Sequence, residues 1–228
     1  MIKNISNLGD AAVYCDFGEE VNEKINSNVI SYFNHVTDLI NKSKIEGINN
    51  LIPSYNKLII CFDLKITNFF KIKNFLLNLK VISNLKTNNK KIEIPVCCDE
   101  EYGLDFERLT KKLNLSKDEI LKLYFDKEYF CYMTGFIAGM PFVGDISKKI
   151  RCNRLETPRV KVPKGSIGIT EQFTNIYTFE SPGGWNIIGN TPIEVFDNSK
   201  ENEPNLINPG DTVIFKEITK DQYLNYEQ

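Results

Sequence analysis

The first ninety residues alternate between two kinds of hydrophobic spacing. Residues 11–17 form a short, mainly apolar run expected of a strand, whereas the apolar positions in 25–40 recur every three or four residues, which is typical of an amphipathic helix. Asn22 stands where a helix cap is expected, because its side-chain oxygen can accept a backbone N–H bond. The pattern predicts strand 11–17, helix 25–40, strands 45–51 and 56–62 joined through Pro53-Ser54, and a helix from about Asn68.

This order of elements predicts a small ferredoxin-like α/β sandwich. Its last strand lies either near Val81 or at 92–97, and the sequence leaves both open. The polar stretch 86–91 contains no residue that would gain from burial, so it is the expected boundary. The predicted domains are therefore residues 1–89 and 90–228.

The second half begins with a short helical pair and then changes character. Ser116 and Glu119 have the spacing of a capping box at the start of one helix. Beyond residue 128, short strands alternate with turns rich in glycine and proline, which predicts a sandwich or closed barrel. The strands expected are 166–169, 176–179, 191–196 and 212–218, with turns at 163–165, 182–184 and 209–211. The predicted fold class is α+β.

Composition narrows the class of protein. Of 228 residues, 42% are hydrophobic and 25% charged, which suffices for a packed core. The net charge of −2 argues against nucleic acid as the main partner. The longest apolar runs, such as 58–62, are far shorter than a membrane span, and the start lacks signal-peptide order. We therefore expect a cytoplasmic protein that does not enter a membrane.

The inventory of reactive side chains excludes several mechanisms. Six cysteines form no CxxC pair and are expected to be buried, reduced thiols. His35, the only histidine in the sequence, lies in a predicted helix, so neither a zinc site nor a Ser-His-Asp mechanism is expected. Phosphate-binding and nucleotide-binding glycine motifs are missing from the sequence. No tightly bound cofactor is expected, and no catalytic residue is assigned.

A glycine-rich segment at 135–144 is the first feature that can carry chemistry. Its glycines and proline stand among large apolar residues, which describes a rigid loop whose backbone can approach a ligand. A tightly packed crossover between strands is an equal alternative. The residues predicted to contact a ligand are Gly135, Phe136, Gly139, Pro141 and Phe142.

The arginines are the second feature. Only four occur beside 24 lysines, and three of them lie within residues 151–159. A guanidinium can bind a carboxylate or phosphate through two bonds, which makes Arg159, fixed by Pro158, the predicted anion-binding residue. Surface ion pairs are expected for Arg151 and Arg154.

The third feature is the segment 180–185, which contains the only tryptophan. Its turn places Trp185 either in the wall of a pocket or as a plug at one end of the barrel. The plug is slightly favoured, because large indoles are usually buried for packing.

Together these features resemble the family of 5-oxoprolinase B subunits, also called the KipI or allophanate hydrolase subunit 1 family. The order and spacing of the motifs match over nearly the whole chain. They are Ile94-Pro95-Val96, Asp99 to Asp105, Gly135 to Gly144, Thr157-Pro158-Arg159, Val162 to Ser166, Ser181 to Trp185, Ile188-Gly189, Thr191-Pro192, Phe196-Asp197 and Pro209-Gly210-Asp211.

The resemblance implies a ferredoxin-like N-terminal domain followed by a cyclophilin-like β-barrel. It also implies two partners, a homologous C subunit and an A subunit, with which the chain would open 5-oxoproline to L-glutamate using ATP as co-substrate. Arg159 would then hold the substrate carboxylate, Lys164 would assist with phosphate, and Thr174 and Trp185 would contribute to binding. Two alternatives are a KipI-like inhibitor of a sporulation histidine kinase and one component of a urea carboxyltransferase, the latter needing biotin from another protein.

Three segments depart from the family pattern. Tyr124 replaces a usual histidine, and Ala138-Gly139-Met140 replaces a Pro-Gly-Phe loop centre. Glu171, Gln172, Phe173 and Thr174 stand in place of a Gly-Gly-Gln-Thr turn. A tyrosine, with a pKa of about 10, exchanges protons poorly near neutral pH compared with histidine.

Overall fold

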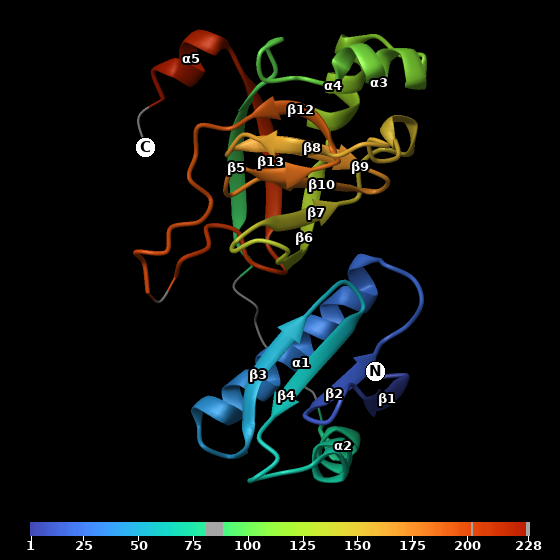
Figure 1. The fold of residues 1–228 in the computed structure, drawn as a ribbon, viewed down its shortest axis with the longest axis vertical. Helices are drawn as coiled ribbons and strands as arrows, with labels where there is room; N and C mark the ends of the chain where they lie inside the picture. The colour runs from blue at the N-terminus through green and yellow to red at the C-terminus, as the bar shows by residue number, and fades with distance from the viewer. Residues whose placement is uncertain (81–88, 202, 227–228) are drawn as a thin grey trace. The chain divides into compact units, whose positions relative to one another are not determined.

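The computed structural model describes residues 1–80, 89–201 and 203–226. Contacts divide the chain into two compact units, residues 1–88 and 89–228 (Figure 1). Each unit has its own hydrophobic core. Val81, one of the two positions considered for a last strand, lies outside the described residues, as does part of the predicted boundary stretch 86–91.

The N-terminal unit is a four-stranded antiparallel sheet with two helices (Figure 1). The strands are β1 (Asn4–Asn7), β2 (Ala12–Asp16), β3 (Ile48–Pro53) and β4 (Lys57–Phe62), in the spatial order β1-β2-β4-β3, and the helices are α1 (Glu23–Asn41) and α2 (Phe69–Asn78). The predicted α/β sandwich is confirmed. Strand β1 was not predicted, because its sequence is polar and buries only Ile5.

Local signals place these helices where the pattern predicts them. The Asn22 side chain accepts a hydrogen bond from the Ile25 N–H at 2.9 Å, and Asn68 accepts one from Lys71 at 3.1 Å. Both asparagines thus satisfy an N–H that the first helical turn leaves unpaired. Alternate residues of β2 and β4 pack against the apolar faces of the helices. The strands contribute Val13, Cys15, Leu58 and Ile60, and the helices contribute Val29, Val36, Ile72 and Leu76.

The second unit is a closed seven-stranded barrel (Figure 1). Around the barrel the order is β10-β7-β6-β13-β5-β12-β9, and β13 and β5 are its one parallel pair among the named strands. Strands β8 and β11 form a separate two-stranded ribbon. The strands are β5 (Lys91–Cys97), β6 (Glu128–Thr134), β7 (Pro141–Gly144), β8 (Arg159–Val162), β9 (Ser166–Thr170), β10 (Phe173–Ile176), β11 (Ser181–Gly183), β12 (Asn186–Asn190) and β13 (Thr212–Ile218).

Helices complete this unit and fill one part of its core. They are α3 (Phe106–Leu113), α4 (Lys117–Phe125), the short 3-10 helix η1 (Lys148–Ile150) and α5 (Lys220–Leu224). The predicted capping box at the start of α4 is confirmed, with bonds in both directions between Ser116 and Glu119. Near its other end, Tyr124 is fully buried against Tyr129 and Phe215, so α4 contributes directly to the barrel core.

Three local predictions were wrong. Residues 191–196 do not continue a strand, because β12 ends at Asn190, Pro192 has no N–H to donate, and the Thr191 hydroxyl accepts the Ile193 N–H instead. The strand expected at 176–179 lies earlier, at Phe173–Ile176. The expected turn at 182–184 starts inside β11, where Gly183 pairs with Arg159 of β8.

The six cysteines are free thiols, five of them buried and Cys61 half-buried, as expected. Burial raises the pKa of the Cys15 thiol to about 12 and also raises that of Cys98. Such thiols stay protonated and unreactive at neutral pH. Within the described ranges, no helix combines the length and apolar character required to cross a bilayer.

Candidate functional site

A small, partly enclosed cavity of about 90 Å³ lies where the β6–β7 hairpin meets the segment before β12. One water occupies roughly 10–15 Å³ on this measure, so the cavity has room for a small molecule. Its wall is mainly aromatic and apolar, with few polar groups. The lining residues are Phe136, Met140, Phe142, Arg154, Asn175, Tyr177, Gly183, Gly184 and Trp185.

The β6–β7 hairpin forms one wall of the cavity, and backbone hydrogen bonds hold its tip in place. The Gly135 N–H donates to the Met140 carbonyl at 3.0 Å, and the Met140 N–H donates to the Ile137 carbonyl at 3.2 Å. Phe136 has a φ of 69°, a region that phenylalanine rarely adopts, and its ring is 78% exposed at the cavity edge. Gly139, with a φ of 67°, packs so closely on the Phe196 ring that no Cβ fits there.

Trp185 forms the opposing wall. Its side chain is 6% exposed and meets the Phe142 ring edge-to-face, with the centroids 5.6 Å apart. This geometry is favourable for two aromatic rings. The indole thus lines the cavity and is at the same time almost fully buried, so the two alternatives that the sequence left open for it are not separated.

Asn175 and Tyr177 supply the polar part of the cavity from β10 and the residue after it. Both side chains are almost fully buried. Burial raises the pKa of Tyr177, while hydrogen bonds from the Asn175 side chain and the Trp185 backbone, and the charges of Arg154 and Arg159, act in the opposite direction. The Tyr177 phenol is therefore protonated at neutral pH and can donate a hydrogen bond.

Arg154 adds a positive charge to this cavity from the exposed segment between η1 and β8. The surface ion pairs predicted for Arg151 and Arg154 are not found among the described residues. Arg151 instead donates to the Ile146 carbonyl at 3.4 Å. The charge of Arg154 has no acidic partner in the described ranges and lies beside the cavity.

The structure brings together only some of the predicted binding residues. Phe136, Phe142 and Trp185 line the cavity. Gly135, Gly139 and Pro141 belong to the same hairpin but do not line it. Thr174 lies away from the cavity, where its hydroxyl shares a 2.9 Å hydrogen bond with the buried Tyr124.

Arg159 and Lys164, the two predicted anion-binding residues, lie outside this cavity and both are already paired. Arg159 contacts the Asp105 carboxylate at 2.7 Å, and Lys164 contacts Glu194. Lys164 lines a different surface pocket, together with Asn190 and Tyr223. The two cations therefore do not converge on one ligand.

The sequence reasoning missed Arg154, Asn175 and Tyr177 as lining residues. Asn175 and Tyr177 could not be found, since their pattern along the chain is that of an ordinary strand. For Arg154 a signal existed, namely the clustering of three arginines, but the sequence does not tell which of them is left unpaired. Pairing depends on Asp105, which is 54 residues away from Arg159 along the chain.

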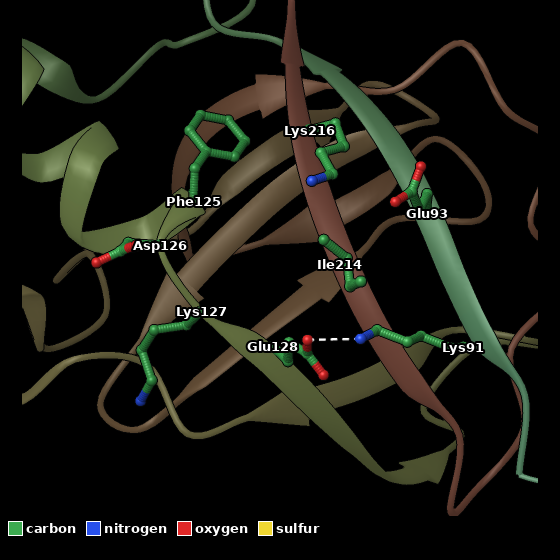
Figure 2. Close-up of a pocket in the computed structure, with 8 residues that line it drawn as sticks. All are labelled: Lys91, Glu93, Phe125, Asp126, Lys127, Glu128, Ile214 and Lys216. Carbon is green, nitrogen blue, oxygen red and sulfur yellow. Dashed lines mark hydrogen bonds and ion pairs between the residues drawn. The ribbon is translucent and has the colours of Figure 1, made fainter.

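A larger and more open groove of about 600 Å³ lies on the outer side of the barrel, beside β5, β6 and β13 (Figure 2). Charges of both signs line it, and Figure 2 shows Lys91 and Glu128 joined in an ion pair of 2.6 Å. Because its three lysines and three carboxylates offset one another, this groove favours neither an anionic nor a cationic ligand. It is lined by Lys91, Glu93, Phe125, Asp126, Lys127, Glu128, Ile214 and Lys216.

Comparison with known proteins identifies the family. A family model described as the carboxyltransferase domain, subdomain C and D, matches residues 3–207. The B subunit of the 5-oxoprolinase of Bacillus subtilis (strain 168) is 33% identical over 236 residues, covering 98% of this chain and 96% of that protein. The chain belongs to the family of 5-oxoprolinase B subunits. The resemblance drawn from the sequence motifs is thus confirmed.

Solved structures share this fold. The crystal structure of TTHA0988 superposes with a TM-score of 0.79 at 28% identity, over 92% of this chain and 40% of that longer chain. The urea carboxylase of Kluyveromyces lactis superposes with a TM-score of 0.75 at 16% identity, over 96% of this chain and 22% of that chain, which shows a shared fold. This fold thus also occurs as part of larger polypeptides.

The described part of this chain contains no cluster of potential metal ligands. In residues 1–80, 89–201 and 203–226, no group of three or more His, Cys, Asp or Glu side chains has the arrangement of a metal site. The described lining of the cavity contains no cysteine, histidine or carboxylate. Its residues are suited to binding a small ligand by aromatic contact, hydrogen bonding and one positive charge.

Proposed function

We propose that this protein is the B subunit of an ATP-dependent 5-oxoprolinase, which opens 5-oxoproline to L-glutamate together with a homologous C subunit and an A subunit. The observation that carries the proposal is the match to a 5-oxoprolinase B subunit over 98% of this chain and 96% of that relative. A match across both units is more specific than a shared barrel, because folds host many functions.

The composition of the cavity supports a role in binding more than a complete active site. Its polar groups are a guanidinium, an amide and a protonated phenol, and none of them is a strong nucleophile or a base near neutral pH. We therefore assign ATP-dependent activation to the complex as a whole, with ATP as its co-substrate. No tightly bound cofactor is assigned to this chain, and the complex is placed in the cytoplasm.

The test is ATP hydrolysis dependent on 5-oxoproline, measured with this chain co-purified with the A and C subunits of its own organism. Each of the three proteins is omitted in turn. We expect activity that is lost when this chain is left out. Turnover that is unchanged without this chain would contradict the proposal.

Two other functions are outcomes of further assays on the same protein. Inhibition of a histidine kinase's autophosphorylation by this chain, with no 5-oxoproline turnover, would indicate the KipI-like regulator. Urea carboxylation that depends on biotin carried by another protein would indicate the carboxyltransferase component. No contact in the described structure favours either of them over 5-oxoprolinase.

A further inference from the structure

We infer that the cavity beside Trp185 binds a small cyclic amide that carries a carboxylate, with Arg154 as the partner of that carboxylate. This inference rests on the proposed function, and it assigns the substrate to a cavity and to residues of this chain. The charge of Arg154, the shape of the cavity and an unpaired oxygen on Asn175 support it.

Charge singles out Arg154. Of the four arginines, Arg108 donates to Asn186, Arg151 donates to the Ile146 carbonyl, and Arg159 is paired with Asp105. Arg154 has no hydrogen bond or ion pair with any residue that the structure describes, and yet it lines the cavity. A carboxylate is the group that a free guanidinium binds best, through two parallel bonds.

Shape limits the size and character of the ligand. The volume of about 90 Å³ accommodates a molecule with one small ring rather than a nucleotide or a peptide. Phe142 and Trp185 form apolar walls, and the exposed Phe136 stands at the opening. A flat five-membered ring can lie against such aromatic surfaces while its carboxylate points to the more exposed Arg154.

The unpaired side-chain oxygen of Asn175 favours a ligand that can donate a hydrogen bond. The side-chain oxygen of Asn175 is buried and has no hydrogen-bond partner in the described structure. The nitrogen of the same amide contacts the Met140 sulfur at 3.9 Å, and the Asn175 side chain also bonds to the Tyr177 phenol. A buried acceptor without a partner is costly. This oxygen lies beneath the cavity wall beside Gly168, and the N–H of a cyclic amide would pair with it once the Asn175 side chain turns toward the cavity.

Trp185 makes this binding directly measurable. Because it is the only tryptophan, the fluorescence of the full-length chain reports on the cavity wall. The protein is titrated with 5-oxoproline, with 2-pyrrolidinone, which lacks the carboxylate, and with the corresponding lactone acid, which lacks the N–H. The variants are Arg154→Gln and the matched control Arg151→Gln, which removes the same charge three residues earlier.

We expect Arg154→Gln to weaken 5-oxoproline binding by about tenfold to a hundredfold, the range of charged hydrogen bonds. Binding of 2-pyrrolidinone should not change, and Arg151→Gln should bind all three molecules as the parent does. The parent should prefer the lactam to the lactone, a comparison that needs no variant. Equal losses in the two arginine variants, or no preference for a carboxylate or an N–H, would overturn the inference.

The same variants in the co-purified complex separate this inference from the proposed function. Turnover that requires this chain, with an unchanged KM for 5-oxoproline in Arg154→Gln, would overturn the cavity assignment and leave the proposed function standing. Saturable 5-oxoproline binding that depends on Arg154, without turnover in the complex, would support the cavity and contradict the proposed function.

Discussion

Arg159 on β8 and Asp105 before α3 form an ion pair with 2.7 Å between the guanidinium nitrogen and the carboxylate oxygen. The second oxygen of Asp105 accepts the backbone N–H of Ile187 in β12 at 2.6 Å. The Asp105 side chain is 5% exposed and that of Arg159 is 26% exposed. One carboxylate thus connects three segments that are distant in sequence, next to the turn that carries Trp185.

This relationship predicts that Arg159 contributes mainly to stability. Replacing Arg159 by alanine leaves a nearly buried carboxylate without its cation, and we expect the barrel to lose about 3 kcal/mol of unfolding free energy. Urea unfolding followed by Trp185 fluorescence measures the effect. The control is Lys161→Ala on the same strand, whose ion pair with Glu180 is exposed and should contribute far less to stability.

A substrate role for Arg159 would appear differently. If the free part of its guanidinium held the substrate carboxylate, KM for 5-oxoproline would rise in Arg159→Ala at a temperature where the variant remains folded. Partial loss of folded protein lowers the maximal rate instead and leaves KM unchanged. The pair with Asp105 favours the second result.

The fate of the arginines illustrates what the sequence determines and what it does not. Spacing and caps predicted α1, α2 and α4 well, since those signals lie within a few residues of one another. Whether an arginine is paired depends on which carboxylate the fold brings to it from far along the chain. Asp105 is such a partner for Arg159, and none of the described carboxylates reaches Arg154. The sequence alone therefore selected Arg159, whereas the structure places Arg154 at the cavity.

Two adjacent glycines offer a matched test of the cavity's shape. A Cβ on Gly183 would overlap the Tyr177 hydroxyl, whereas a Cβ on Gly184 would find its nearest neighbour, a ring carbon of Pro158, at an ordinary 3.5 Å. Gly183→Ala must therefore displace the Tyr177 ring, and we expect a loss of about 1–3 kcal/mol in barrel stability and altered Trp185 fluorescence.

Gly184→Ala should stay within about 0.5 kcal/mol of the parent, as expected for a substitution that fits. Similar effects of the two substitutions would show that the cavity tolerates movement of Tyr177. The cavity would then not be a rigid, preformed site, in contrast to what the packing of Phe142 on Trp185 indicates.

Tyr124, which the sequence singled out as a departure, is a core residue. Burial raises the pKa of Tyr124 well above its ordinary value, and its hydroxyl pairs with Thr174 at 2.9 Å. Tyr124→Phe leaves the buried Thr174 hydroxyl unpaired and should cost about 1–2 kcal/mol of unfolding free energy. The double variant Tyr124→Phe with Thr174→Val removes both partners and should cost less than the sum of the losses in Tyr124→Phe and in Thr174→Val. Urea unfolding of the three variants tests this coupling.

The same variants test the predicted binding role of Thr174. Because neither side chain lines the cavity, 5-oxoproline binding should be unchanged in all of them. A higher KM in Thr174→Val alone would return this residue to the binding site. The sequence could not separate these cases, since a buried threonine and a ligand-binding threonine look the same in a strand pattern.

The N-terminal unit carries a charge pair whose contribution depends on pH. Asp16 of β2 lies opposite Lys57 of β4, with 2.7 Å between carboxylate oxygen and ammonium, and the same oxygen accepts the Gly18 N–H. The hydrogen bond from Lys57 is the main cause that lowers the pKa of Asp16 below its usual value. A carboxylate with a lowered pKa stabilises the folded state above the unfolded pKa of about 4.

This stabilisation should be lost as the pH falls through the lowered pKa of Asp16. We expect Asp16→Asn to reduce the stability of the N-terminal unit by about 1 kcal/mol at pH 7, a modest value because the pair is partly solvated. The difference should shrink below pH ~4, when the parent carboxylate also becomes neutral. Hydrogen exchange of the β2 and β4 amides reports on this unit alone, whereas Trp185 reports on the barrel. A difference that persists undiminished well below that pH would show that the contact acts through shape and not charge.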